Sequence, residues 1–201
     1  MRKYVMLLLV LILLPIAASS THAAGLYLGA SVGAAMTNGI GDEGVDVNID
    51  DSGTGWEALA GFRFAGPLGA ELAYVDLGKV SAEGLGFSDA LKSHGIQFSA
   101  VATFPPASPF AVQARFGGFA WTQDYDLDND GETISDSENG TTICGGVGLR
   151  YNMKTLDRLG INAKWTRYFD VGNEDSGAQL DRDFFALGAT WSFGGNEAAA
   201  E

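Results

Sequence analysis

The chain has 201 residues, with 25 acidic against 12 basic side chains and a formal net charge of −13. Such an excess of acid excludes binding to nucleic acid by general electrostatics, and the single cysteine, Cys144, excludes an intramolecular disulfide. The length suits one domain or one small barrel.

Residues 1–23 have the pattern of a secretory signal peptide. Arg2 and Lys3 precede an uncharged, mostly apolar run from Tyr4 to Ala18, and small residues then lead to Ala23. The run is short for a retained membrane helix, so we expect cleavage after Ala23. We expect the folded part to be residues 24–193, and residues 194–201 to be a disordered tail.

Eight later segments alternate between apolar side chains and small or polar ones, as strands do when successive side chains point to opposite faces. Each has about the ten residues that a tilted membrane-spanning strand needs. In the last segment, one face carries only apolar side chains and ends in Trp191 and Phe193. The eight predicted strands are residues 26–36, 56–64, 68–77, 96–104, 110–121, 143–152, 159–166 and 183–193.

The connections between these strands alternate between long and short. The long, acidic ones are residues 37–55, 78–93, 122–141 and 172–182, and the short ones are residues 65–67, 105–109 and 153–158. Outer-membrane barrels have short periplasmic turns and long external loops. The pattern therefore predicts an all-β fold, an eight-stranded antiparallel up-and-down transmembrane β-barrel with acidic extracellular loops and periplasmic termini.

The alternative fold is a secreted soluble barrel, apolar inside and polar outside. The polar face argues against it, because it is rich in glycine and poor in charge, whereas a solvated surface carries charge on every strand. We therefore assign the polar face to the interior. Its charged residues, which we expect to pair and plug the barrel, are Glu57, Glu71, Arg63, Arg115, Arg150 and Lys164.

Three stretches resemble the eight-stranded outer-membrane β-barrel superfamily, which includes OmpA transmembrane domains and OmpX-like proteins. They are residues 146–151 (GVGLRY), 167–172 (RYFDVG) and 187–193 (LGATWSF). The resemblance implies a Gram-negative outer-membrane location and insertion by the outer-membrane assembly machinery, which in this family reads a terminal aromatic such as Phe193. We expect no peptidoglycan-binding domain after the barrel, so the resemblance does not imply tethering to the cell wall.

Two motifs fall short of a functional site. His94 follows Ser93, but strand neighbours face opposite ways, so the pair does not indicate a nucleophile and its base. Asp126, Asp128, Asp130 and Gly131 match the first half of an EF-hand, but Ser137 replaces the final glutamate, which favours a solvated acidic loop. We predict no catalytic, cofactor-binding or metal-binding residue, and no enzyme.

The predicted function is therefore a structural or surface-interaction role, with acidic loops presented on a plugged barrel. A small porin-like channel is the alternative, and a lipid-modifying outer-membrane enzyme comes third. The expected partners are outer-membrane lipid, lipopolysaccharide and the assembly machinery. The sequence leaves open whether the acidic loops bind an external ligand or a divalent cation. We expect the protein to be a monomer.

Overall fold

The computed structural model describes residues 25–38, 48–50, 52–64, 66–84, 87–106, 108–129, 132–153, 155–156, 158–172 and 180–193. The predicted signal peptide and the predicted tail lie outside these residues. No helix in the described part of the chain is long and apolar enough to cross a membrane. The strands are β1 Gly25–Asn38, β2 Asn48–Asp50, β3 Ser52–Arg63, β4 Leu68–Gly84, β5 Phe87–Phe104, β6 Phe110–Asn129, β7 Glu132–Asn152, β8 Leu159–Val171 and β9 Leu180–Phe193.

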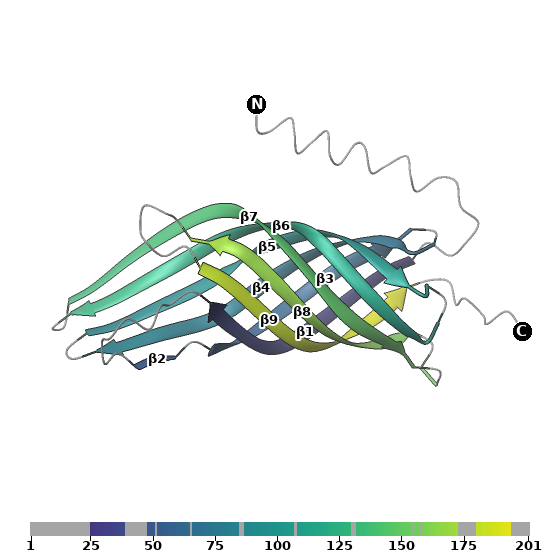
Figure 1. Ribbon diagram of the computed structural model, residues 1–201, viewed down its shortest axis with the longest axis horizontal. Helices are drawn as coiled ribbons and strands as arrows, with labels where there is room; N and C mark the ends of the chain where they lie inside the picture. The colour runs from purple at the N-terminus through teal and green to yellow at the C-terminus, as the bar shows by residue number, and fades with distance from the viewer. Residues whose placement is uncertain are drawn as a thin grey trace, which may run out of the picture.

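The strands form one antiparallel sheet that closes on itself (Figure 1). Neighbours in sequence pair along the sheet, and β9 pairs with β1 from Leu26↔Phe193 to Asn38↔Asp181, which closes the barrel. The three-residue β2 adds to the far end of β4, so eight strands make the barrel wall. Closure satisfies every strand edge in the wall, as a hydrocarbon surrounding requires. This confirms the predicted architecture.

Two of the predicted long loops are wrong, because the backbone continues as paired strand through them. Residues 78–84 belong to β4 and residues 87–93 to β5, and the two strands pair out to Gly84↔Phe87. Residues 122–129 belong to β6 and residues 132–141 to β7, and the two strands pair out to Asn129↔Glu132. Both hairpins extend well beyond the other strands, at the barrel end opposite the short turns (Figure 1). The loops 37–55 and 172–182 are also shorter than predicted, since β1, β2, β3 and β9 take up part of them.

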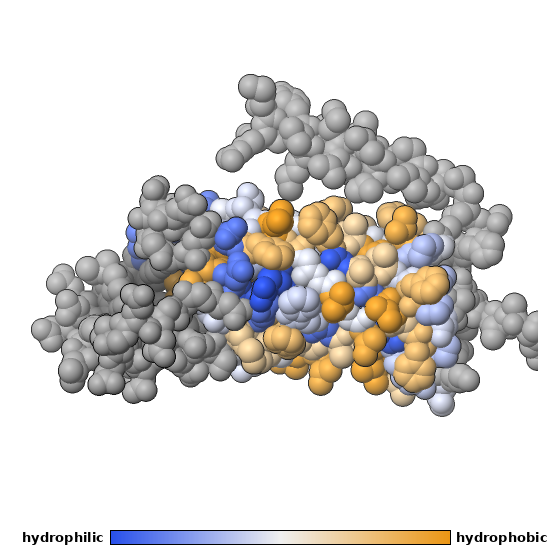
Figure 2. Space-filling model, viewed as in Figure 1, coloured by the Kyte–Doolittle hydropathy of each residue, from blue (hydrophilic) through white to orange (hydrophobic). Residues whose placement is uncertain are grey.

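The two faces of the wall are as the alternation predicts. On the outward face, Leu187, Phe116 and Leu149 expose 67%, 64% and 63% of their surface, whereas inward-facing Glu57 exposes 1%. Apolar side chains gather over the part of the barrel next to the short turns (Figure 2). An exposed apolar band around a barrel with a polar interior is the arrangement of outer-membrane barrels.

Inward-facing glycines serve two different purposes. A Cβ at Gly61 would lie 2.2 Å from the ring of Tyr27, so this glycine makes room for a larger interior side chain. A Cβ at Gly117 would lie 1.9 Å from the carbonyl oxygen of Phe98 on the neighbouring strand. At Gly117 the absence of a side chain lets two strand backbones approach, which the tight coiling of a narrow barrel requires.

Candidate functional site: the charged interior of the barrel

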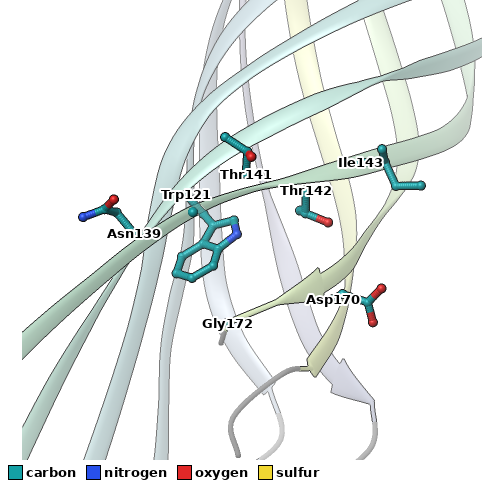
Figure 3. A pocket seen from close by; sticks show the side chains of 8 residues that line it. Trp121, Asn139, Thr141, Thr142, Ile143, Asp170 and Gly172 are labelled. Carbon is teal, nitrogen blue, oxygen red and sulfur yellow. The ribbon is translucent and has the colours of Figure 1, made fainter. Parts of the chain in front are cut away.

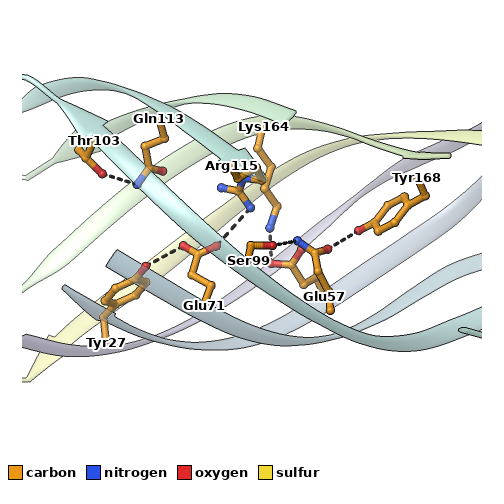
Figure 4. Close-up of polar contacts among 10 residues, drawn as sticks. Tyr27, Glu57, Glu71, Ser99, Thr103, Gln113, Arg115, Lys164 and Tyr168 are labelled. Carbon is orange, nitrogen blue, oxygen red and sulfur yellow. Dashed lines mark hydrogen bonds and ion pairs between the residues drawn. The ribbon is translucent and has the colours of Figure 1, made fainter. Parts of the chain in front are cut away.

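Two buried ion pairs cross the interior of the barrel (Figure 4). Lys164 on β8 donates a hydrogen bond to Glu57 on β3, and each side chain exposes 1% of its surface. Arg115 Nη1 on β6 lies 3.4 Å from Glu71 Oε2 on β4. The first pair joins strands that are three apart around the barrel, and the second joins β4 and β6, which flank β5, so both pairs tie together strands that are not hydrogen-bonded neighbours. Burial makes an uncompensated charge costly, which is why the four side chains pair.

A phenol completes the second pair. Tyr27 on β1 donates to Glu71 Oε1 over 2.7 Å, so one carboxylate joins β1, β4 and β6. The guanidinium of Arg63 lies 4.9 Å from the centre of the Tyr27 ring, on its face, in cation–π geometry. Sequence reasoning did not single out Tyr27, although its inward position follows from the alternation of β1.

The structure brings the predicted charged residues together in the interior. Glu57, Glu71, Arg115 and Lys164 form the two ion pairs. Arg63 and Arg150 line a cavity of about 10 Å³ together with Glu71, Arg115 and Lys164, and they extend this cluster towards the short turns, where both also line a cavity of about 20 Å³ with Gly66 and Pro67. Neither arginine is without a partner. The prediction of paired charge is confirmed for the first four residues.

Hydrogen bonds between neutral side chains extend from the ion pairs towards both ends of the barrel. Tyr168 donates to Gln97 Oε1 over 2.7 Å, and Gln97 Nε2 donates to Ser99 over 2.7 Å (Figure 4). On the side of the short turns, Gln113 Nε2 donates to Thr103 over 3.2 Å. Sequence reasoning assigns these residues only to the polar face, because alternation gives a side chain's direction but not its partner.

A layer of buried apolar and aromatic side chains lies on the long-hairpin side of the ion pairs. The rings of Phe119 and Tyr168 are 4.7 Å apart between centroids. The layer, every member of which exposes 5% of its surface or less, consists of Leu77, Phe119, Trp121, Tyr168, Val171 and Phe184. The sequence analysis assigns Arg182 to the predicted loop 172–182, and this assignment is wrong. Arg182 lies in β9, is fully buried and is on the same face of the strand as Phe184. The apolar layer separates the charged cluster from the hairpin end.

The space beside the ion pairs is small. The cavity lined by Glu71, Arg115 and Lys164 has a volume of about 10 Å³, which is at the lower limit for a single water molecule. The charged interior is thus packed with its own side chains. It offers no room for a substrate beside these residues.

A wider hollow lies at the hairpin end, where β7 leaves β8 (Figure 3). The two strands pair only as far as Cys144↔Tyr168, and β7 then continues with β6 alone. The hollow measures about 630 Å³ and is lined by Trp121, Asn139, Gly140, Thr141, Thr142, Ile143, Asp170 and Gly172. Amide, hydroxyl and carboxylate groups make this lining suited to a polar ligand.

His94 and Ser93 lie on opposite faces of β5, as predicted. Ser93 is fully buried and accepts a hydrogen bond from Gln123 Nε2 over 3.3 Å, whereas His94 Nδ1 lies 3.7 Å from Asp124 Oδ2. The serine hydroxyl is therefore not placed for activation by His94.

Near His94, the hydrogen bond and charge of Asp76 raise the pKa of Lys92, whose Nζ is 3.1 Å from that carboxylate.

The predicted acidic loop is only partly a loop. Asp126 and Asp128 lie on β6, paired with Ser135 and Thr133, so this stretch has strand geometry rather than that of a calcium loop. Asp130 and Gly131 lie outside the described residues. Within the described ranges, no three acidic, histidine or cysteine side chains come together as metal ligands.

Comparison with known proteins supports an outer-membrane barrel. The family described as OmpA-like transmembrane domain matches residues 21–197. Outer membrane protein A of Serratia marcescens is 27% identical over 191 residues, covering 90% of this chain and 48% of that protein. The Shigella flexneri protein is 24% identical over 175 residues, covering 86% and 50%. The chain thus spans about half the length of these curated relatives.

Solved structures show the same fold at low identity. The outer membrane protein OprG from Pseudomonas aeruginosa has a TM-score of 0.60 and 16% identity, with 87% of this chain and 98% of that chain covered. A major outer membrane protein from Thermus thermophilus has a TM-score of 0.59 and 16% identity, with 86% and 100% covered. At this identity, the likeness establishes the fold alone.

Proposed function

The chain belongs to the family of OmpA-like transmembrane domains of the Gram-negative outer membrane, and we propose that it serves as a plugged scaffold that presents its long hairpins outside the cell. The observation that carries the proposal is the pair of buried ion bridges under an apolar layer. Glu57–Lys164 and Glu71–Arg115 fill the cross-section with paired charge. An ion would have to displace these partners and then pass the buried rings of Phe119 and Phe184.

The surface role rests on the two long hairpins. The β4–β5 and β6–β7 hairpins continue the wall by pairing past Asp76 and Cys144, beyond the exposed apolar band. They hold acidic positions such as Glu83 and Asp128, and the β6–β7 hairpin lines the polar hollow together with Asp170. Strand pairing gives the hairpins a fixed direction, so they present this surface on a rigid base.

Single-channel recording in planar bilayers tests the plug. We expect the purified wild-type barrel to show no channel conductance, because the interior ion pairs Glu57–Lys164 and Glu71–Arg115 are both more than nine-tenths buried. Glu71→Ala should destabilise the barrel, since it leaves Arg115 unpaired. A large, steady wild-type conductance would contradict the plug and favour the porin-like channel. So would a Glu71→Ala protein of unchanged stability and raised conductance.

We also propose that the chain carries no catalytic activity. His94 Nδ1 lies 3.7 Å from the carboxylate of Asp124, and Ser93 faces the interior on the opposite side of the strand. Mass spectra of lipid A and phospholipid from cells expressing wild type and His94→Ala should be the same. A modified lipid that disappears with His94 would overturn this proposal.

Insertion by the outer-membrane assembly machinery is part of the same proposal. β9 places Trp191 and Phe193 on the outward face, at the seam where it pairs with β1. The closed seam leaves no strand edge in the membrane, which supports a monomer. Replacing Phe193 with serine should slow insertion in vivo, measured as the fraction of heat-modifiable barrel after a pulse label.

A further inference from the structure

A groove of about 520 Å³ crosses the outer surface of the barrel over β7, β8 and β9, from Val112 on β6 to Val32 on β1. Its floor is Ala163, which pairs in register with Leu149 on one side and Leu187 on the other. The alanine leaves a depression between two larger, exposed side chains. The next outward-facing row along the strands holds Trp165 and Phe185, whose rings stack 6.4 Å apart between centroids. The groove is thus an apolar channel with an aromatic wall.

A positively charged side chain, that of Arg167, lies beyond the Trp165 end of this groove. Arg167 is the next outward residue after Trp165 on β8, and its Nε and Nη2 donate to Asp183 over 2.8 and 2.6 Å. Trp165 Nε1 donates to the same carboxylate over 2.9 Å. The Arg167 side chain exposes 33% of its surface, against 10% for Asp183. The more buried carboxylate of Asp183 therefore fixes the position of the Arg167 guanidinium, which is the more exposed group of the pair.

The cation lies at the height of a lipid headgroup. Eight residues separate Leu159, at the short-turn end of β8, from Arg167. At about 3.3 Å per residue and a tilt of about 40°, this is a rise of about 20 Å. The apolar band of such barrels is about 25 Å tall. Arg167 is thus near the boundary on the long-hairpin side, with Ala163 deeper in the hydrocarbon.

We propose that this groove binds one lipid A molecule, with an acyl chain over Ala163 and a phosphate on Arg167. The apolar groove can hold the acyl chain of the lipid. The exposed guanidinium can donate two charge-assisted hydrogen bonds to the phosphate, as arginine commonly does. The choice of lipid A, the acylated and phosphorylated lipid of the outer leaflet, rests on the proposed function, which places the long hairpins outside the cell.

Native mass spectrometry of the folded barrel, released from detergent micelles, measures this binding. The probes are bisphosphorylated lipid A, the same lipid after dephosphorylation, and phosphatidylglycerol. We expect wild type to retain one bisphosphorylated lipid A and to bind the other two at least tenfold more weakly. Arg167→Gln should reduce binding of the phosphorylated lipid to the level of the dephosphorylated one.

Ala163→Phe fills the floor of the groove and should weaken retention at least tenfold. Ala100→Phe is the matched control, because Ala100 is also exposed but lies on β5, three strands away. Equal retention in Ala163→Phe and wild type would overturn the site, as would equal loss in both variants. Equal binding of phosphatidylglycerol would overturn lipid A as the occupant. The wild-type lipid comparison needs no variant to fold.

These outcomes are distinguishable from a failure of the proposed function. Binding by the purified barrel does not depend on which end faces outward in the cell or on whether the interior conducts. An inverted topology would leave lipid retention intact and would be detected by surface labelling of the hairpins instead.

Discussion

Glu71 lies in the interior between the phenol of Tyr27 and the guanidinium of Arg115. Glu71→Ala removes the partner of a buried cation, and breaking such a pair costs about 3–5 kcal/mol. Chemical unfolding of the barrel in micelles should show this loss. Asp136→Ala is the control, since this exposed carboxylate should change the free energy of unfolding by less than about 0.5 kcal/mol. Equal effects of the two variants would contradict a dry, paired interior.

Neighbouring glycines on β6 offer a second test at the scale of single residues. A Cβ at Gly117 would lie 1.9 Å from the carbonyl oxygen of Phe98, whereas at Gly118 the nearest atom would be 3.7 Å away. Gly117→Ala should therefore force the β5 and β6 backbones apart and cost about 1–3 kcal/mol, as overpacking does. Gly118→Ala should be close to neutral in the same unfolding measurement. A neutral Gly117→Ala would mean that the strands do not approach this closely.

At the scale of a strand, the apolar face should tolerate charge according to depth. Leu187, 67% exposed in the middle of β9, should lose about 2–4 kcal/mol on replacement by arginine, because hydrocarbon surrounds it. Leu68, 58% exposed at the first residue of β4, should lose only about 0–1 kcal/mol, since the interface is near. Unfolding from lipid vesicles measures both. Equal costs would contradict the assignment of the outward face to lipid.

The strands also show where sequence reasoning works and where it stops. Alternation finds the part of each strand that has lipid on one side, such as Phe185 to Phe193. Beyond the lipid, both faces of a strand can be polar, so alternation ends while backbone pairing continues. This is why the sequence places Lys92 and Asp124, which pair in register, in loops. Arg182 is missed for the same reason.

At the scale of the whole barrel, alternation predicts the interior residues but not their partners. Glu57 and Lys164 are 107 positions apart in sequence. They meet because the tilt and stagger of the strands bring them to the same height, and the stagger belongs to the closed sheet rather than to any strand. The hydrophobic layer around Phe119 and Tyr168 arises in the same way. The sequence therefore predicts a paired interior without naming its pairs.

The orientation of the whole barrel follows from its unequal ends. Long β4–β5 and β6–β7 hairpins at one end, and short turns near Pro67 and Pro106 at the other, are typical of external and periplasmic ends. In a Cys144→Ser background, Glu83→Cys and Asp128→Cys should react with an impermeant maleimide on intact cells. Pro106→Cys, exposed in a short turn, should react only after the outer membrane is opened. The same experiment extends to Asp42 and Asp175, which lie outside the described residues. Labelling of Pro106→Cys alone on intact cells would invert the topology, because a closed barrel passes no reagent from one end to the other.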